Sequence, residues 1–193
     1  ANPLVHDGQK LVPSVTRVFK SSRDLYVYLQ AYEPYAPALQ PLVDATPTGG
    51  TLRLQPGSYA GPATISRTMT IDGSDGVTVT NSGTGTVITI HADGVTIRNM
   101  MIRDSGHQHH TLDACLRVEA ANFVVIKDNA LFGCLVGIDL RHANSNIVRR
   151  NIVIGSDTSF DMRGDGIRVW YSRDNRLESN TVRGHRDLLV EYS

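Results

Sequence analysis

The sequence repeats at regular intervals, and this repeat constrains the fold more than any other feature. Apolar residues recur in two ladders, with spacings of 29, 22 and 29 residues in one and of 28, 22, 29 and 21 residues in the other. The first ladder contains Ile97, Ile126, Val148 and Leu177, and the second contains Ile88, Leu116, Ile138, Ile167 and Leu188. A period of roughly 20 to 50 residues is typical of a solenoid. Because the segments within each period are short, β-branched and alternating, they are expected to be strands, and the sequence predicts an all-β parallel β-helix.

Alternation along each strand predicts which side chains form the core. Ile167 and Val169 are expected to point inward while Arg168 points outward, since side chains alternate across a strand. Equivalent residues of successive coils would then stack about 4.8 Å apart. A further stack is expected at Ile102, Leu131, Val153 and Val182. No coil can bury its own apolar face alone, so we expect the coils to share one continuous core.

Three asparagines, Asn129, Asn151 and Asn180, occupy one equivalent position of the repeat. Asparagine tolerates left-handed backbone conformations and forms local hydrogen bonds at turns. When asparagines stack, each side-chain amide can bond the amides above and below it. Met100 stands at the equivalent position of the preceding coil, so the ladder is expected to begin at Asn129. We interpret these residues, and the turn residue Asn175, as structural and not as ligands.

Composition argues against several classes of function. The chain carries 19 Lys and Arg and 19 Asp and Glu residues, so its net charge of zero gives no attraction to nucleic acid or to an anionic membrane. Aromatic residues make up 6% of the chain, which is low for a surface that stacks nucleic-acid bases. No apolar run approaches the roughly 18 residues that a membrane span needs, so no membrane insertion is expected. Residues 1–10 lack the basic and apolar regions of a signal peptide.

The two cysteines are expected to remain unbridged. Cys115 aligns with Gly137 in the repeat, three residues beyond Cys134. Three extended residues span about 10 Å, which is too far for a disulfide without local rearrangement. We therefore predict free or buried thiols, which say little about the cellular compartment.

Residues 1–36 do not follow the repeat and are expected to form a segment of their own ahead of a β-helix over residues 37–193. The strand-like runs VTRVF and LYVYLQAY predict a hairpin in this segment. A carbohydrate-stacking strip of Tyr26, Tyr28 and Tyr32 is the alternative. The segment weakly resembles a strand pair of bacterial proteins related to von Willebrand A domains, which suggests a composite or engineered chain.

The two ends of the β-helix are expected to differ. A short helix is predicted to begin near Pro37 and to end before Thr46, because proline residues limit it. The face that this helix presents is formed by Leu39, Leu42 and Val43. A solenoid exposes an apolar end unless it is capped, so this helix is the expected N-terminal cap. No comparable cap follows Leu188 and Val190, and we expect self-association through residues 175–193, because unpaired strand edges recruit other strands.

Four stretches of the chain carry a resemblance to a known family: TLRLQPGSYAGPATISRTMTIDG, GVTIRNMMIRDSG, GDGIRVW, and RDLL followed by YS. Through them the chain from about Pro37 to Ser193 resembles the NosD family, the periplasmic accessory proteins of nitrous oxide reductase maturation. The resemblance implies a right-handed parallel β-helix of the carbohydrate-binding and sugar-hydrolase type. It also implies a periplasmic location and work with a membrane ABC transporter and a copper chaperone in building a copper site.

The sequence departs from that family at its end. The family's next repeat carries a His and a Met in the pattern R-Y-G-L-H-x-M-Y-S, and this sequence stops before it. Because soft Met and imidazole ligands suit Cu(I), the departure counts against copper handling by this chain. Glu191 stands where the family often has Trp. Residues 1–36 look foreign to the family, so we expect a fragment or a composite of such a protein.

The loop SGHQHHTLDAC is the candidate metal site. It contains His107, His109, His110 and Asp113 within a seven-residue insertion of the repeat, where β-helices place functional loops. Imidazole is the commonest side-chain ligand for metals, and three histidines can bind Zn²⁺ or Cu²⁺. The resemblance to the NosD family makes copper the candidate cofactor. The alternative is a solvated polar insertion between coils.

Equivalent positions of stacked coils bring a second group of polar residues together. The group consists of Arg141, His142, Asp161, Asp165, Trp170, Arg186 and Asp187. Asp165 and Arg186 align one coil apart, and they could form an ion pair or could line a groove in which Trp170 stacks on a sugar.

Clustered aspartates also raise the hypothesis of an enzyme. A glycosidase needs two carboxylates roughly 5–10 Å apart, and Asp161 and Asp165 are the pair closest to that requirement. The adjacent Asp pair of β-helix hydrolases is absent from the sequence. The function that we favour is the one that the resemblance to the NosD family implies, a non-catalytic periplasmic factor for copper-site assembly. The alternatives are a carbohydrate-binding or polysaccharide-processing β-helix and a structural solenoid without a ligand.

Overall fold

The chain divides into two compact units, Ala1–Pro34 and Tyr35–Ser193. The structure is a computed structural model, and it describes residues 5–6, 9–10, 36–74, 76–156 and 158–193. Within the first unit, β1 (Val5–His6) and β2 (Gln9–Lys10) pair in antiparallel orientation. The predicted hairpin of VTRVF and LYVYLQAY, with its three tyrosines, lies outside the described residues.

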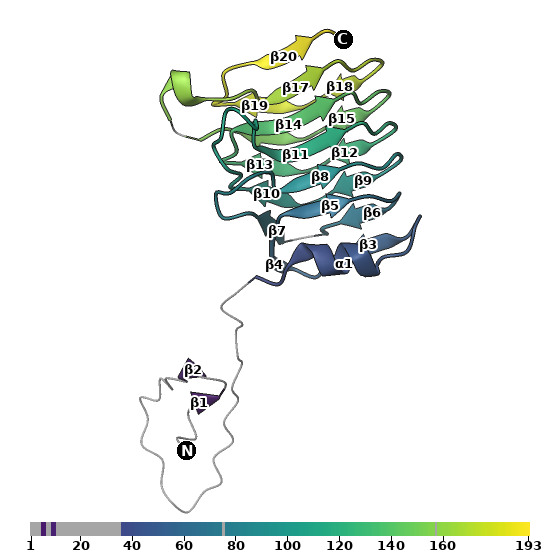
Figure 1. Cartoon of the computed structure of the whole chain (residues 1–193), viewed down its shortest axis with the longest axis vertical. Helices are drawn as coiled ribbons and strands as arrows, with labels where there is room; N and C mark the ends of the chain where they lie inside the picture. The colour runs from purple at the N-terminus through teal and green to yellow at the C-terminus, as the bar shows by residue number, and fades with distance from the viewer. Residues whose placement is uncertain (1–4, 7–8, 11–35, 75, 157) are drawn as a thin grey trace, which may run out of the picture. The chain divides into compact units, whose positions relative to one another are not determined.

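The second unit is a stack of six coils, each of which contributes one strand to each of three parallel sheets (Figure 1). The first sheet contains β3 (Thr51–Arg53), β6 (Thr70–Asp72), β9 (Thr96–Arg98), β12 (Val125–Lys127), β15 (Ile147–Arg149) and β18 (Arg176–Glu178). The second contains β4 (Gly57–Ala60), β7 (Val77–Thr80), β10 (Met101–Arg103), β13 (Ala130–Phe132), β16 (Ile152–Ile154) and β19 (Thr181–Arg183). The third contains β5 (Ala63–Ile65), β8 (Ile88–Ile90), β11 (Ala114–Glu119), β14 (Val136–Arg141), β17 (Ile167–Trp170) and β20 (Leu188–Glu191). The predicted parallel β-helix is confirmed.

The register of the sheets follows the ladders of the sequence. The first ladder pairs Ile97 with Ile126, Ile126 with Val148, and Val148 with Leu177. The second ladder and the stack that contains Ile102 pair in the same way, each residue with its equivalent one coil away. Every predicted inward stack is therefore a real column of neighbouring side chains.

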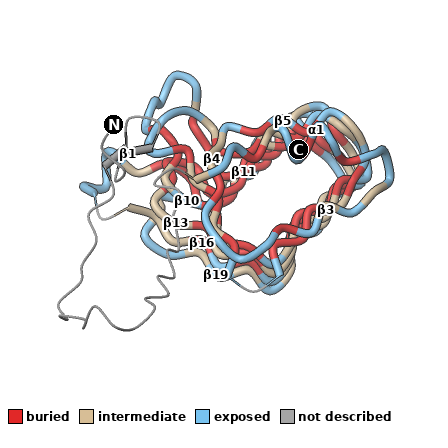
Figure 2. Tube along the Cα trace, turned by 90° about the horizontal axis from the view of Figure 1, so that it is seen from below, coloured by how far each residue is buried: buried red, intermediate tan, exposed pale blue. Residues whose placement is uncertain are grey.

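Buried residues recur along the strands of the first five coils, as the view along the stack shows (Figure 2). Ile97, Leu116, Ile126 and Ile138 have no exposed surface. One hydrophobic cluster runs from the N-terminal helix to Val169 in the fifth coil. Since roughly 25 cal/mol is gained for each Å² of apolar surface buried, this shared core is the main source of stability.

The asparagine ladder is confirmed, with one correction about the backbone. The Nδ2 atom of Asn129 donates to Oδ1 of Asn151 at 3.1 Å, and Nδ2 of Asn151 donates to Oδ1 of Asn180 at 3.0 Å. The left-handed residues are those just before the ladder, for example Asp128 and Arg150 with φ of 58° and 52°. The ladder asparagines therefore satisfy the polar groups of the turns, while their neighbours make the turns.

The helix α1 (Leu39–Ala45) lies across the first coil, at the place where the sequence predicts a cap (Figure 1). Leu39 and Val43 are buried and belong to the main core. The prediction that Leu42 shares this face is wrong, because its side chain is 37% exposed. Residues four apart lie on the same side of a helix, and that spacing selects Leu39 and Val43.

The prediction of unbridged cysteines is also wrong, because Cys115 and Cys134 form a disulfide with their Cα atoms 5.6 Å apart. The prediction treated the chain from Cys134 to Gly137 as extended. In fact β13 ends at Phe132 and β14 begins at Val136, so the chain turns a corner between them. Disulfides persist in oxidising compartments such as the bacterial periplasm.

The alternating spacing of 29 and 22 residues arises at one corner of the coils, between the second and third sheets. Two long loops, residues 104–113 and 155–166, join the strands there in the third and fifth coils. Two short loops, residues 133–135 and 184–187, make the same connection in the fourth and sixth coils. We call these four loops together the loop corner. The inserted residues of the repeat therefore all gather on one edge of the stack.

In the sixth coil, Leu188 and Val190 of β20 are 52% and 56% exposed. Self-association through residues 175–193 stays a prediction.

Replacement of Ile138 by Asp is expected to unfold the protein. Ile138 has no exposed surface and stacks between Leu116 and Ile167, so an unpaired charge there costs about 3–5 kcal/mol. The matched control is Ile152→Asp, because Ile152 is 47% exposed on a strand of the same coil stack. Thermal unfolding followed by circular dichroism should show a large loss for Ile138→Asp and little change for Ile152→Asp. Equal melting temperatures in the two variants would contradict the register.

Removal of the disulfide is expected to lower the free energy of unfolding by about 3 kcal/mol, the value for a loop of this size. Cys115 and Cys134 are 19 residues apart, so the bridge restricts the unfolded chain. Urea unfolding of the wild type with and without a reducing agent measures the effect. The double variant Cys115→Ala, Cys134→Ala serves as the control and should not respond to the reducing agent. Two free thiols in the untreated protein, found by mass spectrometry, would overturn the prediction.

Candidate functional site

The outer face of the third sheet carries a buried cluster of charges beneath the loop corner. Asp139 has no exposed surface and accepts hydrogen bonds from three arginines. Its Oδ2 atom lies 3.1 Å from Nε of Arg117 and 2.6 Å from Nε of Arg141, and its Oδ1 lies 3.3 Å from Nη1 of Arg168. The strand register explains this arrangement, because Arg117, Asp139 and Arg168 are paired neighbours on β11, β14 and β17. We call these four residues the arginine cluster.

The arginine cluster holds the histidine-containing loop in place. Nη2 of Arg117 donates to the carbonyl oxygens of Thr111 and Leu112 at 2.9 and 2.6 Å. Nη2 of Arg141 donates to the same Thr111 carbonyl at 3.3 Å. One carboxylate thus orients two guanidinium groups, and these in turn fix the end of loop 104–113. The sequence predicts that Arg141 lines a groove, and the structure places its guanidinium against Asp139 and the Thr111 carbonyl.

The four predicted metal ligands of the loop do not meet at one point. Asp113 is buried, and its two oxygens accept hydrogen bonds from the Gln108 amide and the Thr111 hydroxyl. His109 and His110 lie exposed in the turn of the loop, while His107 lines a small cavity farther along the loop corner. Among the described residues, no group of three or more His, Cys, Asp and Glu side chains is placed to hold a metal ion. The structure thus gives no support to a metal site formed by these four residues, and that site stays a prediction.

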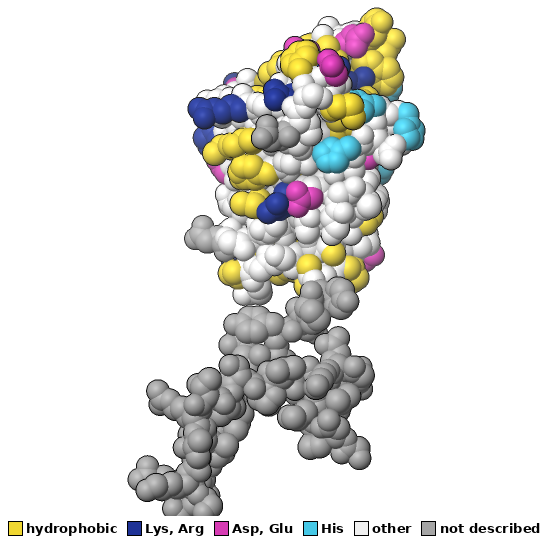
Figure 3. Space-filling model, turned by 90° about the vertical axis from the view of Figure 1, so that its left-hand side faces the viewer, with side chains coloured by type: hydrophobic (Ala, Val, Ile, Leu, Met, Phe, Trp, Pro, Cys, Tyr) yellow, Lys and Arg dark blue, Asp and Glu magenta, His cyan; other side chains and the backbone are white. Residues whose placement is uncertain are grey.

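Histidine side chains nevertheless gather over the loop corner, at the upper right of the face in Figure 3. The small cavity there has a volume of about 10 Å³, which is the space of a single water molecule or ion. His107, Met162 and His185 line it, together with Cys134, whose sulfur is held in the disulfide. Met162 lies on the short 3₁₀ helix η1 (Phe160–Met162), within the long loop of the fifth coil.

His185 is the most unusual side chain of this cavity. Its Nε2 atom is buried and has no hydrogen-bond partner in the structure. Burial lowers the pKa of His185 below its usual value, because desolvation disfavours the charged imidazolium. The backbone of Gly164 and of Leu135 and the carboxylate of Asp165 act in the opposite direction. An imidazole nitrogen without another partner can bind a metal ion, and copper is among the metals that imidazole suits.

Glycine residues allow the loops of this corner to approach closely. A Cβ atom on Gly164 would overlap the carbonyl oxygen of Leu135 in the short loop of the preceding coil. The Gly164 carbonyl in turn accepts a hydrogen bond from the Arg186 amide at 2.9 Å. The close contact places the η1 loop directly over Leu135 and beside His185.

The second predicted group separates into distinct parts. Asp165 is buried, and its Oδ1 atom accepts a hydrogen bond from Nη2 of Arg186 at 3.2 Å, which agrees with the ion-pair interpretation. Nε of Arg186 lies 3.6 Å from Oδ2 of Asp187, an exposed residue. Asp161 is exposed on η1. Asp165 is thus held against Arg186, while Asp161 lies on the surface.

His142 and Trp170 lie at a different corner, between the third and first sheets. Their ring centroids are 5.2 Å apart in an edge-on contact. His142 also stacks on Tyr171 at 5.5 Å, and Tyr171 stacks on Tyr192 at 4.8 Å. The guanidinium of Arg168 lies 5.2 Å from the Trp170 ring centroid, a cation–π contact that joins this aromatic column to the arginine cluster.

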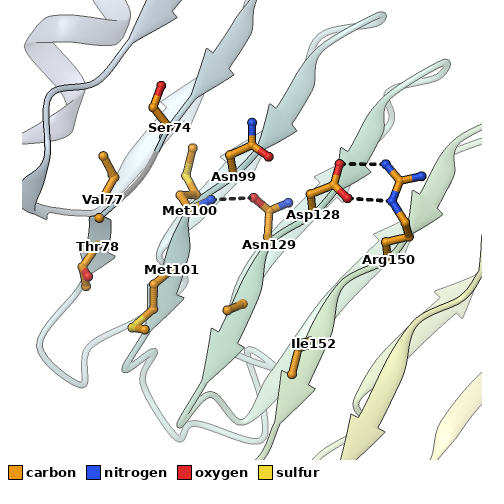
Figure 4. A pocket seen from close by; sticks show the side chains of 12 residues that line it. Ser74, Val77, Thr78, Asn99, Met100, Met101, Asp128, Asn129, Arg150 and Ile152 are labelled. Carbon is orange, nitrogen blue, oxygen red and sulfur yellow. Dashed lines mark hydrogen bonds and ion pairs between the residues drawn. The ribbon is translucent and has the colours of Figure 1, made fainter.

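An open groove of about 820 Å³ lies over the turns between the first and second sheets (Figure 4). Met101 and Ile152 form part of its apolar floor. The charged pair at its side is satisfied internally, because Arg150 donates to both oxygens of Asp128 at 2.7 and 2.8 Å. That pair lowers the pKa of Asp128 through the Arg150 hydrogen bond. None of the residues predicted for a site lies in this groove.

Sequence reasoning missed Arg117, Asp139 and Arg168, although the ladder contained a signal for them. Each one follows an inward ladder residue directly, so the three form an outward column of alternating charge. Met162 and His185 were missed for another reason. They lie in loops of different coils, and only the folded loops bring them to the cavity of His107.

The fold and the loop corner define a parallel β-helix protein with a loop-borne candidate site for a single small ion. The chain belongs to the NosD family, because the model of that family, described as "Periplasmic copper-binding protein (NosD)", matches residues 48–191. This stretch covers all six coils. The resemblance seen in the sequence is thereby confirmed.

A relative and a solved structure show similarity to the chain. The "Probable ABC transporter binding protein NosD" of Pseudomonas aeruginosa is 29% identical over 140 residues, which cover 72% of this chain and 33% of the relative. The chain thus spans about a third of the length of this curated relative. A protein described as a "putative glycosyl hydrolase" from Parabacteroides merdae aligns with a TM-score of 0.47 at 14% identity, over 74% of this chain and 81% of the other.

In the described part of the chain, no helix combines the length and the apolar character that a membrane crossing requires.

Neutralisation of Asp139 is expected to destabilise the protein and to release the histidine loop. Asp139→Asn leaves three arginines without their buried counter-charge, which costs about 3–5 kcal/mol. Asp128→Asn is the matched control, because the Asp128–Arg150 pair is solvent-exposed and contributes about 1 kcal/mol or less. Urea unfolding measures both changes, and hydrogen exchange should accelerate at residues 105–112 in Asp139→Asn only. Equal effects of the two substitutions would show that the arginine cluster does not hold the loop.

Proposed function

We propose that this chain is the β-helical body of a non-catalytic periplasmic factor for copper-site assembly in nitrous oxide reductase. In this role it binds to a membrane ABC transporter and works with a copper chaperone. The observation that carries the proposal is the NosD family match over residues 48–191, which includes every strand of the three parallel sheets. Copper is the cargo of this process and not a resident cofactor of an enzyme.

The architecture supports a binding role. The coils form a rigid stack, and the insertions of the repeat lie on one edge, the loop corner. Loops on a rigid scaffold are where proteins place binding residues. The arginine cluster donates hydrogen bonds to the backbone of loop 104–113. The rigid stack therefore holds in place the loop that carries the histidines.

The charges also favour binding over polysaccharide cleavage. Asp165 is buried against Arg186, and Asp139 is buried against three arginines. A glycosidase needs two carboxyl groups that flank the scissile bond, whereas these two aspartates contact arginines. The relative from Pseudomonas aeruginosa carries a name that describes a transporter binding protein, in keeping with an accessory role.

The test is co-purification with the transporter. The chain is exported to the periplasm of a denitrifying Pseudomonas strain that lacks its own NosD, and membranes are solubilised in mild detergent. Affinity capture of the folded chain should enrich the subunits of the ABC transporter over an unrelated periplasmic protein. The unfolded variant Ile138→Asp should capture none. The copper content of the nitrous oxide reductase from the same cells is a second measurement.

Two outcomes would contradict the proposal. The first is a folded chain that captures no transporter above the unrelated control. The second is release of reducing ends or unsaturated sugars from uronate polymers by the wild type, lost in Asp165→Asn, which would favour the polysaccharide-processing hypothesis.

A further inference from the structure

Three loops from three different coils converge on one small cavity at the loop corner. His107 comes from the long loop of the third coil, Met162 from the long loop of the fifth, and His185 from the short loop of the sixth. Cys134 and Leu135, from the short loop of the fourth coil, form the base. The short loop of the fourth coil thus lies between two long loops in the stack, and residues of all three loops line the cavity.

The size of the cavity limits what it can hold. Its volume of about 10 Å³ admits one water molecule or one ion and excludes a sugar ring. A buried polar atom without a partner destabilises a protein, and Nε2 of His185 is such an atom at this cavity. A ligand that binds this nitrogen would remove that cost.

The donor atoms of the cavity select a soft ion. The described residues that line the cavity offer two imidazoles and one thioether and include no carboxylate, while the sulfur of Cys134 is held in the disulfide. Thioether ligands favour Cu(I), while Zn²⁺ sites use thiolate, imidazole and carboxylate. Arg163 also lines the cavity, with its Nε donating to the Thr158 carbonyl at 3.0 Å. A nearby guanidinium favours an ion of low charge over a divalent one.

We propose that His107, Met162 and His185 bind one Cu(I) ion in this cavity. The proposal rests on the proposed function, in which copper is the cargo, and it identifies the residues that would hold it. His107 is exposed and Met162 is 55% exposed, so two of the three ligands can be reached by a protein that delivers or removes the ion. His109 and His110, at the tip of the loop, are not part of the site.

The first experiment measures Cu(I) affinity of the full chain. Under anaerobic conditions, the protein competes with the chromophoric chelator bicinchoninate for Cu(I), and one ion should bind per chain. His107→Asn, Met162→Leu and His185→Gln should each weaken binding by at least about tenfold, the lower range for loss of groups that support a metal. Met162→Leu conserves the volume of the side chain, and the side chain of Met162 is largely exposed. The variant should therefore fold normally.

The matched control variants replace histidine and methionine side chains that lie outside the cavity. His109→Asn and His110→Asn alter histidines of the same loop, and Met101→Leu alters a methionine in the groove of Figure 4. All three should keep the wild-type affinity. X-ray absorption at the copper edge gives an independent readout, because a sulfur neighbour of copper should be present in the wild type and absent in Met162→Leu.

The results that would overturn the proposal are distinct. Unchanged affinity in Met162→Leu and His185→Gln, or no competition by the wild type, would show that the cavity holds only water. Loss of affinity in His109→Asn and His110→Asn alone would move the site to the tip of the loop. A chain that captures the transporter but binds no Cu(I) would overturn this site and leave the proposed function intact. A chain that binds Cu(I) in this cavity but captures no transporter would do the reverse.

Discussion

Parallel pairing between successive coils is the interaction on which the rest of this structure depends. The strands of one coil are only three to six residues long, and none could form a stable sheet alone. Each finds its hydrogen-bond partners in the coils above and below, and the same stacking buries Ile97, Ile126 and Val148 in one column. The asparagine ladder extends this pairing to the turns, where Asn129 and Asn151 bond to each other. Coil stacking therefore supplies both the core and the satisfaction of the buried backbone.

Coil stacking also decides where variation is tolerated. An insertion inside a strand would shift every later residue to the wrong face, whereas an insertion at a corner leaves the register intact. The chain places its long insertions at the loop corner, in the third and fifth coils. The short loop of the fourth coil lies between them, and the short loop of the sixth coil brings His185 to the cavity. The candidate site is thus a consequence of alternating loop lengths on a regular stack.

Two of the buried ion-paired groups of this stack lie near the loop corner, and they connect different parts of it. The arginine cluster surrounds Asp139 and ends on the carbonyl groups of Thr111 and Leu112, so it links the scaffold to a loop. The Asp165–Arg186 pair joins the fifth and sixth coils beside the cavity. Buried ion pairs are costly to desolvate, and their clearest use is to select one arrangement over others. Here the arrangement that the ion pairs select is that of the loops at the loop corner.

Much of the fold was predictable from the sequence, because the stack is nearly one-dimensional. Equivalent residues recur along the chain. The ladders that contain Ile97 and Ile138 therefore predict the strands, their register and their inward faces. The same ladders brought Asp165 next to Arg186, and the pair is present. The helical cap followed from an apolar face bounded by prolines, although only Leu39 and Val43 are buried in it.

The loops were decided by the tertiary structure alone. Loop residues have no partner at a fixed sequence interval, so their contacts depend on how each corner turns in space. The turn after Phe132 brings Cys134 to Cys115, where an extended chain would have kept them apart. In the same way, the sequence by itself identified histidines and a period, and only the folded corner placed Met162 and His185 at the cavity of His107. Repetition determines the strands, whereas three-dimensional packing of non-repeated segments determines the site.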